Sequence, residues 1–221
     1  MRILLVCVLA CALAAPALAA AGDPQRSHTL AGSLAAQKAL LKPSDFAKGW
    51  KSAAAKPAAP NGVCKDTRPN LSDLTEAGFA ESPDFSLGQL ESVSQTVRVY
   101  ENARQARTAY SRTVTIGLVS CLADQLRAAS SAKAKVTIAG QSRLPLPRVA
   151  DQVDGFRVVA HTAVKSEKEQ FDVYAYVVVI RKGATISTIS VGSFRQPADA
   201  LASQLAQVVG RRLGGGKPAA S

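Results

Sequence analysis

The alternation of hydrophobic and polar residues is clearest in the second half of the chain. Three runs, 156–164, 171–180 and 185–191, are rich in valine, isoleucine and aromatic residues, and the short polar stretches KSEKEQ and RKG separate them. Short polar connections favour antiparallel neighbours, so this pattern predicts a meander of three strands. The middle run contains VYAYVVVI, which is apolar on both faces and therefore predicts a central strand covered on both sides.

An earlier part of the chain has the pattern of a strand followed by that of a helix. In VSQTVRVY (93–100) the three valines share one face and polar residues share the other, as in a half-buried strand. Asn102 then precedes Gln105 by three residues, which is typical of a capping box at the start of a helix. Apolar residues recur beyond it at steps of three and four, and Gly117 is a point where this helix bends or splits. The predicted core stripe contains Ala103, Ala106, Tyr110, Val114, Leu118, Cys121 and Leu122.

Proline and glycine residues mark where the remaining predicted elements begin and end. GSLAAQKALLKPSDF (32–46) predicts a helix that ends before Pro43, and 51–62 reads as a loop or a weak edge strand. AKVTIAG (134–140) predicts a short strand, and the two prolines at 145 and 147 make 142–155 an irregular connection. A last helix begins at Pro197 and stops at Gly214.

This order of elements predicts an α+β fold. We expect a twisted, mostly antiparallel sheet packed against helices, because the strands cluster in sequence and the helices each carry one apolar stripe. The length suits a single domain over 30–213, preceded by a flexible segment at 20–29 and followed by a disordered tail at 214–221.

The first nineteen residues have the pattern of a secretory signal peptide. Arg2 precedes an apolar run that ends in Ala17-Leu18-Ala19, which favours cleavage after residue 19, with Ala21 as an alternative. A transmembrane anchor is disfavoured because the run is shorter than the ~20 residues of a span and contains Pro16. A lipid anchor on Cys11, which follows a loose lipobox, is a second alternative. The signal predicts a secreted or envelope protein.

Two of the four cysteines leave with the signal, so the mature chain retains Cys64 and Cys121. In an oxidising compartment an even pair of this kind predicts a disulfide, which would join the loop of Cys64 to the helix of Cys121. Closing a loop of this length corresponds to about 4 kcal/mol in the chain-entropy model. The alternative is two buried thiols.

The charge distribution is uneven. The net charge is +11, or +10 after loss of Arg2. The segment 69–101, which begins just after Arg68, nevertheless holds six carboxylates and one arginine. A basic secreted protein is attracted to anionic wall polymers or lipid headgroups, and the alternative is that the charge serves solubility alone. Nucleic acid is not expected as a partner, because the chain lacks a basic stripe interleaved with aromatic residues.

Catalytic and metal chemistry find little support in the residue pattern. Of the two histidines, His28 lies in the flexible segment and His161 on the strand face opposite Val158 and Val164. Zinc needs about four ligands and a general base needs an orienting group, so no metal site or cofactor is expected. Asp73, Glu76, Glu81 and Asp84 occupy a loop-like stretch with Pro69 and Pro83, where we expect them to be solvated or to cap helices. Their spacing matches no EF-hand loop.

The aromatic residues give the remaining site candidates. Trp50 is the single tryptophan and follows Phe46, an arrangement typical of a core anchor. Tyr174 and Tyr176 share a face of the central strand, where they either pack beneath a helix or line a cleft. If a cleft exists, the residues that we expect to bind its ligand are Trp50, His161, Tyr174 and Tyr176.

Several stretches together carry a family resemblance: LLKPSDFAKGW, CKDTRPNLSDLTEAGFAESPDFS, VRVYENARQARTAYSRTV and ADALASQLAQVVGRRL. They resemble the secreted α+β domains of actinobacterial-type lipoproteins and kinase sensors, such as the extracellular sensor domain of PknH-type Ser/Thr kinases. The resemblance implies a non-catalytic sensing or binding module outside the membrane. Those sensor domains resemble a two-disulfide framework, whereas this chain has one cysteine pair and no kinase domain.

The sequence therefore predicts a secreted, non-catalytic binding or sensing module of the cell envelope, with an unidentified ligand. The alternative function is a structural protein that adheres to an anionic wall or membrane through its basic surface.

Overall fold

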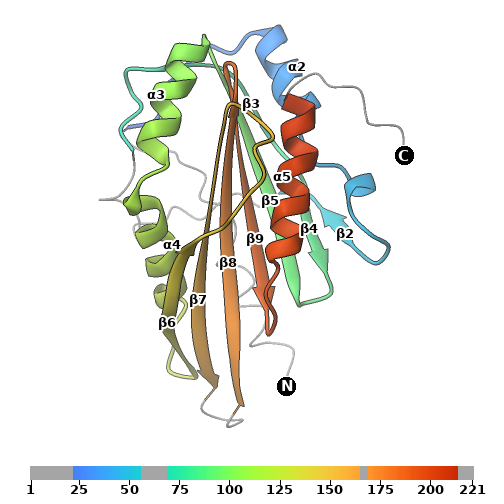
Figure 1. The fold of residues 1–221 in the computed structure, drawn as a ribbon, viewed down its shortest axis with the longest axis vertical. Helices are drawn as coiled ribbons and strands as arrows, with labels where there is room; N and C mark the ends of the chain where they lie inside the picture. The colour runs from blue at the N-terminus through green and yellow to red at the C-terminus, as the bar shows by residue number, and fades with distance from the viewer. Residues whose placement is uncertain (1–21, 56–68, 165–168, 214–221) are drawn as a thin grey trace.

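A computed structural model of the protein describes residues 22–55, 69–164 and 169–213. In these residues nine strands form one sheet in the order β1-β3-β5-β9-β8-β7-β6, and β4 pairs with β5 and β2 (Figure 1). The pairing of β1 with β3 is parallel and every other pairing is antiparallel. The predicted single-domain α+β fold is confirmed.

Along the chain, two runs of four strands, β2–β5 and β6–β9, are separated by the helices α3 and α4, and α5 follows the second run. The bounds of the elements are β1 Gln25–Arg26, α2 Leu30–Lys38, the 3-10 turn η2 Pro43–Asp45, β2 Lys51–Ala53, β3 Thr75–Glu81, β4 Asp84–Leu87, β5 Glu91–Tyr100, α3 Ala103–Thr113, α4 Ile116–Ala128, β6 Ala134–Arg143, β7 Gln152–Val164, β8 Glu169–Lys182, β9 Thr185–Phe194 and α5 Asp199–Leu213.

Helices lie on both faces of the sheet. α3 and α4 pack on one face, against alternate residues of β7 and β8 such as Val158 and Val173. α2 and α5 pack on the other face, where α5 covers Val178 and α2 covers Val97. In Figure 1 the lower ends of β7 and β8 extend beyond α5, so no helix of the described residues covers the lower part of this second face.

The meander β7-β8-β9 is the centre of the fold, as its pattern predicts. Val173, Ala175 and Val177 face α3 and α4, while the alternate residues face α5, and this burial on both faces explains the unbroken apolar run. β7 begins at Gln152 and β6 continues to Arg143, so the irregular connection is shorter than predicted.

The acidic stretch after Pro69 corrects a prediction. It was expected to be loop-like, but it contains β3 and β4. Glu76 on β3 is 1% exposed and is accommodated because its two carboxylate oxygens pair with Arg98 and with His28 Nε2, the latter at 2.8 Å. A buried carboxylate whose two oxygens are both paired does not force a strand into solvent.

The segment 25–29, which was expected to be flexible, runs along β3 instead. Backbone N–H groups of Gln25, Ser27 and Thr29 donate to carbonyls of the β3 region at 2.8–2.9 Å. α2 then crosses β3 at a close approach, since a Cβ at Gly78 would lie 2.2 Å from the carbonyl carbon of Gly32. Two glycines therefore allow the backbones of α2 and β3 to touch.

The predicted helices differ from the observed ones at their ends. The first ends at Lys38, four residues earlier than Pro43 requires, and η2 follows. The long helix after Asn102 divides into α3 and α4 at Val114, which leaves the helical region with ψ 70°. Asn102 accepts from the Gln105 N–H as predicted, but the Gln105 side chain bonds Glu101 and Thr75 instead of closing a capping box.

Candidate functional site

The part of the second sheet face that α5 leaves uncovered carries a cluster of polar side chains. The antiparallel register places His161 of β7 opposite Asp172 of β8, and Val159 opposite Tyr174. We call His161, Asp172 and Tyr174 the open-face triad. The prediction that His161 lies on the face opposite Val158 and Val164 is confirmed, because both valines are buried and the His161 side chain is 65% exposed.

The triad is held together by Asp172. One carboxylate oxygen of Asp172 pairs with His161 Nδ1, and the other accepts a hydrogen bond from the Tyr174 hydroxyl at 3.4 Å. Burial, and then the negative charge and hydrogen bond of Asp172, raise the pKa of Tyr174. Because Asp172 fixes Nδ1, the orientation of the imidazole is set and its Nε2 is presented at an exposed position.

A second ion pair flanks the triad beside the first turn of α5. Arg157 Nη1 donates to both carboxylate oxygens of Asp199 at 3.1 and 3.2 Å. Arg157 is four residues from His161 on the same strand face, so the two side chains are separated by roughly 13 Å. The Arg157 Nε atom is buried and has no hydrogen-bond partner among the described residues. Tyr174 lies between the two ion pairs.

Tyr176 and Trp50 are structural rather than part of this cluster. Tyr176 is 1% exposed, and its hydroxyl accepts the Ala198 N–H at 2.8 Å, which pins the chain entering α5. Burial raises the pKa of Tyr176. Trp50 packs with Phe46, whose ring stacks on Phe85 at 4.3 Å, near β2 and β4. The structure thus brings together two of the four predicted binding residues and places Tyr176 beneath α5.

Sequence reasoning did not find Asp172, Arg157 and Asp199. Each is a common surface residue type, and their positions together follow only from the pairing of β7 with β8 and from the start of α5.

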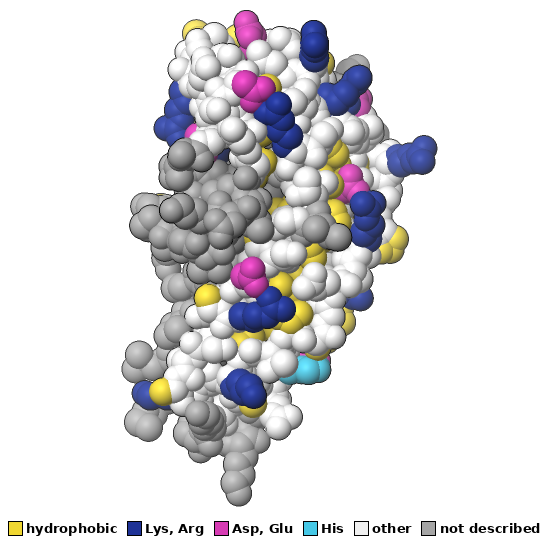
Figure 2. Space-filling model, turned by 90° about the vertical axis from the view of Figure 1, so that its left-hand side faces the viewer, with side chains coloured by type: hydrophobic (Ala, Val, Ile, Leu, Met, Phe, Trp, Pro, Cys, Tyr) yellow, Lys and Arg dark blue, Asp and Glu magenta, His cyan; other side chains and the backbone are white. Residues whose placement is uncertain are grey.

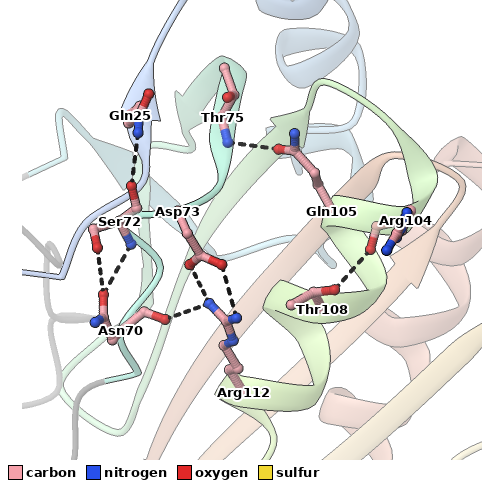
Figure 3. A network of polar contacts seen from close by, with 9 residues as sticks. All are labelled: Gln25, Asn70, Ser72, Asp73, Thr75, Arg104, Gln105, Thr108 and Arg112. Atoms are coloured by element: carbon pink, nitrogen blue, oxygen red, sulfur yellow. Dashed lines mark hydrogen bonds and ion pairs between the residues drawn. The ribbon is translucent and has the colours of Figure 1, made fainter.

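A second polar network fastens the acidic segment to α3 (Figure 3). Arg112 donates to both carboxylate oxygens of Asp73, and to the Asn70 carbonyl at 2.9 Å. The Gln105 side chain accepts the Thr75 N–H at 2.6 Å. The hydrogen bond from Arg112, and then its positive charge, lower the pKa of Asp73. The network attaches the start of β3 to a helix and presents no group toward the open-face triad.

The predicted cysteine pair is described in part. Cys121 lies on α4 at 9% exposure, and Gln125 Nε2 donates to its Sγ at 3.7 Å. Cys64 lies outside the described residues, as do the signal peptide and the tail at 214–221. Their roles remain predictions.

The charged surface is dispersed over the face shown in Figure 2. Lysine and arginine side chains stand apart from one another there, with hydrophobic side chains exposed in a band between them. In the described part of the chain, no group of three or more histidine, cysteine or carboxylate side chains is arranged to hold a metal ion. No helix in those same residues is long and apolar enough to cross a membrane.

No family model matches the chain, and no curated protein matches it. The solved structures that are similar to it include the following two. The extracellular domain of PknH from Mycobacterium tuberculosis has a TM-score of 0.44 and 11% identity, with coverage of 81% of this chain and 95% of that chain. The Rv0999 ortholog from Mycobacterium smegmatis has a TM-score of 0.40 and 10% identity, with coverage of 77% and 92%.

The first of these is the extracellular domain that the sequence resembles, so the expected likeness is confirmed. At such identities and TM-scores the likeness transfers no function and no residue role to this chain.

Proposed function

We propose that the protein is a secreted, non-catalytic binding or sensing module whose ligand contacts the open-face triad and the flanking Arg157. The observation that carries this proposal is the orientation of an exposed imidazole by Asp172, whose second oxygen accepts from the Tyr174 hydroxyl. These groups belong to the paired ends of β7 and β8, which extend beyond α5 (Figure 1). A site with fixed donors, acceptors and an aromatic ring can select a polar ligand.

Binding is favoured over hydrolysis by the contacts of His161. A serine or cysteine hydrolase needs a nucleophile hydrogen-bonded to its histidine. In the described residues the polar partner of His161 is Asp172. The imidazole is therefore available to a ligand rather than engaged in activating a side chain.

The site is tested on protein recovered from a secreting host by native and denaturing mass spectrometry. We expect an extra mass that dissociates on denaturation and that is lost from the double variant His161→Ala/Tyr174→Ala. The control Asp124→Ala/Arg127→Ala removes an exposed ion pair on α4 and should retain the mass. An extra mass that persists in the site variant, or bare wild-type protein, would overturn the proposal.

We also propose that Cys64 and Cys121 form a disulfide in the mature protein. The polar network of Figure 3 holds Asn70 and Asp73 against α3, and the next helix, α4, carries Cys121. Asn70 lies six positions after Cys64, a span of at most about 20 Å when extended. Thiol titration of the unfolded protein without reductant should find no free thiol, and the denatured mass should place signal cleavage after Ala19.

Adhesion to an anionic wall or membrane is the second candidate function, favoured by the net charge of +11. Binding to phosphatidylglycerol vesicles should then fall steeply as salt rises, because exposed charges are screened within about 10 Å at 0.1 M salt. Capture by the open-face triad would depend on salt far less. Vesicle binding that is unchanged by salt would remove adhesion through charge.

A further inference from the structure

β6 forms one lateral edge of the sheet, and the first half of that edge is closed by the chain itself. The Val136 N–H donates to the Ser130 hydroxyl at 3.0 Å, and that hydroxyl contacts the Val136 carbonyl at 3.4 Å. In the same way the Ala134 N–H donates to the Ser131 hydroxyl, and the Ala134 carbonyl accepts the Ser131 N–H at 2.8 Å. The backbone groups that Ala134 and Val136 direct away from β7 are thus satisfied.

The second half of β6 is open. A bulge between Ile138 and Gly140 changes which residues point outward. The Leu144 N–H donates to the Gly155 carbonyl of β7 at 2.8 Å. Because the backbone N–H and C=O groups of successive strand residues point alternately toward and away from the neighbouring strand, those of Gln141 and Arg143 point away from β7. Both residues are exposed, and within the described residues their outward N–H and C=O groups have no partner. This leaves a short template to which an extended segment can pair.

Basic residues predominate around this template, although Arg127 is paired with Asp124 and Arg143 with Asp154. From residue 125 to residue 150 the chain contains no aspartate or glutamate and five basic residues, which are Arg127, Lys133, Lys135, Arg143 and Arg148. Asp154 of β7 accepts from Arg143 at 3.3 Å, but Arg143 remains 77% exposed. A second copy of the chain would bring like charges together at this edge, whereas an acidic strand would be attracted.

We propose that the open half of β6, from Ala139 to Arg143, is a docking edge for an extended acidic segment of a partner protein, which adds to the sheet as a further strand. Main-chain hydrogen bonds to Gln141 and Arg143 supply pairing, and the basic residues select an acidic sequence. The edge is separate from the open-face triad and does not depend on its function.

The test uses an acetylated hexapeptide of alternating valine and glutamate, titrated into isotopically labelled full-length protein. We expect saturable shifts of the Gln141 and Arg143 amides and slower hydrogen exchange at both. The matched peptide of valine and lysine should not bind, and N-methylation of the outward amides of the acidic peptide should abolish binding. Shifts spread over all basic surfaces, or equal binding of the lysine peptide, would overturn the proposal.

Two variants locate the site. Gln141→Pro removes an outward N–H and should weaken peptide binding by at least about fivefold while the fold is retained, because that group bonds no strand of this sheet. Arg143→Gln should weaken binding about two- to fivefold, whereas Arg148→Gln, which removes the same charge off the strand, should have a smaller effect. Equal losses for the two arginine variants, or a dimer formed through β6 in sedimentation, would contradict the assignment.

Discussion

Tyr174 and Tyr176 lie two residues apart on the same face of β8, and the difference between their surroundings divides this face into two parts. Tyr176 is covered by the chain that enters α5, and its hydroxyl is bound to the Ala198 N–H. Tyr174 lies beyond the helix, and its hydroxyl donates to the partly exposed Asp172. The same residue type is a core group in the covered part and a surface contact in the open part.

The comparison shows that residue type and strand face together do not assign a role. The point at which α5 begins decides which tyrosine is buried, and this point is set by the turn after β9, where the Ser193 hydroxyl donates to the Gln196 carbonyl at 2.7 Å. Tyr174, two residues from Tyr176 on the same face of β8, therefore lies outside the core. We expect the two parts to respond differently to substitution.

Truncation of the two tyrosines should give the largest difference. Tyr176→Ala leaves a cavity beneath α5 and should lower the free energy of unfolding by about 3–5 kcal/mol. Tyr174→Ala removes a partly exposed ring and should cost about 1.5 kcal/mol or less. Urea unfolding measures both values, and equal losses would show that the division between covered and open parts is wrong.

The packing of α5 itself gives a smaller effect. A Cβ at Gly210 would lie 2.5 Å from the Cγ2 atom of Val149 in the loop that crosses this helix. Gly210→Val should therefore destabilise the protein by about 1–3 kcal/mol through overpacking. Gln207→Val, on the exposed side of α5, is the control and should change stability by about 0.5 kcal/mol or less. A neutral Gly210 variant would indicate that α5 and the loop move apart freely.

The sequence pattern was sufficient to predict the meander. A strand buried on both faces has a continuous apolar run, and a strand buried on one face has alternating apolar and polar residues, so both can be seen in the sequence. It failed at β3, where Glu76 in the strand looks like a loop residue. The reason is that the carboxylate is paired with His28, 48 positions away, and with Arg98 on the neighbouring strand β5. Such long-range pairs have no local signal.

The candidate site was predictable only in part. His161 and Tyr174 stand out by residue type, but the role of Asp172 depends on the register between β7 and β8. The polar stretch KSEKEQ does not fix that register, and a shift by one residue would place Asp172 on the opposite face from His161. Arg157 and Asp199 depend in addition on where α5 begins.

The smallest expected effect distinguishes the two tyrosines by their titration. Burial raises the pKa of Tyr174 first, and the charge of Asp172 and the hydrogen bond that it accepts raise it further. Asp172→Asn removes the charge, so the pKa of Tyr174 should fall toward its ordinary value, while stability at neutral pH changes by less than about 1 kcal/mol. Tyr176 should keep its raised pKa, because burial is its main cause.

NMR of tyrosine labelled at Cζ follows the two rings separately during an alkaline titration. A tyrosine whose pKa is raised by folding stabilises the protein fully below the pKa of the unfolded chain, about 10, and this contribution is lost as pH rises above it. The Asp172→Asn variant should therefore lose less stability than the wild type on going to alkaline pH. If Tyr174 titrates unchanged in the variant, Asp172 does not hold the open-face triad together, and the imidazole of His161 has no fixed orientation from which to bind a ligand.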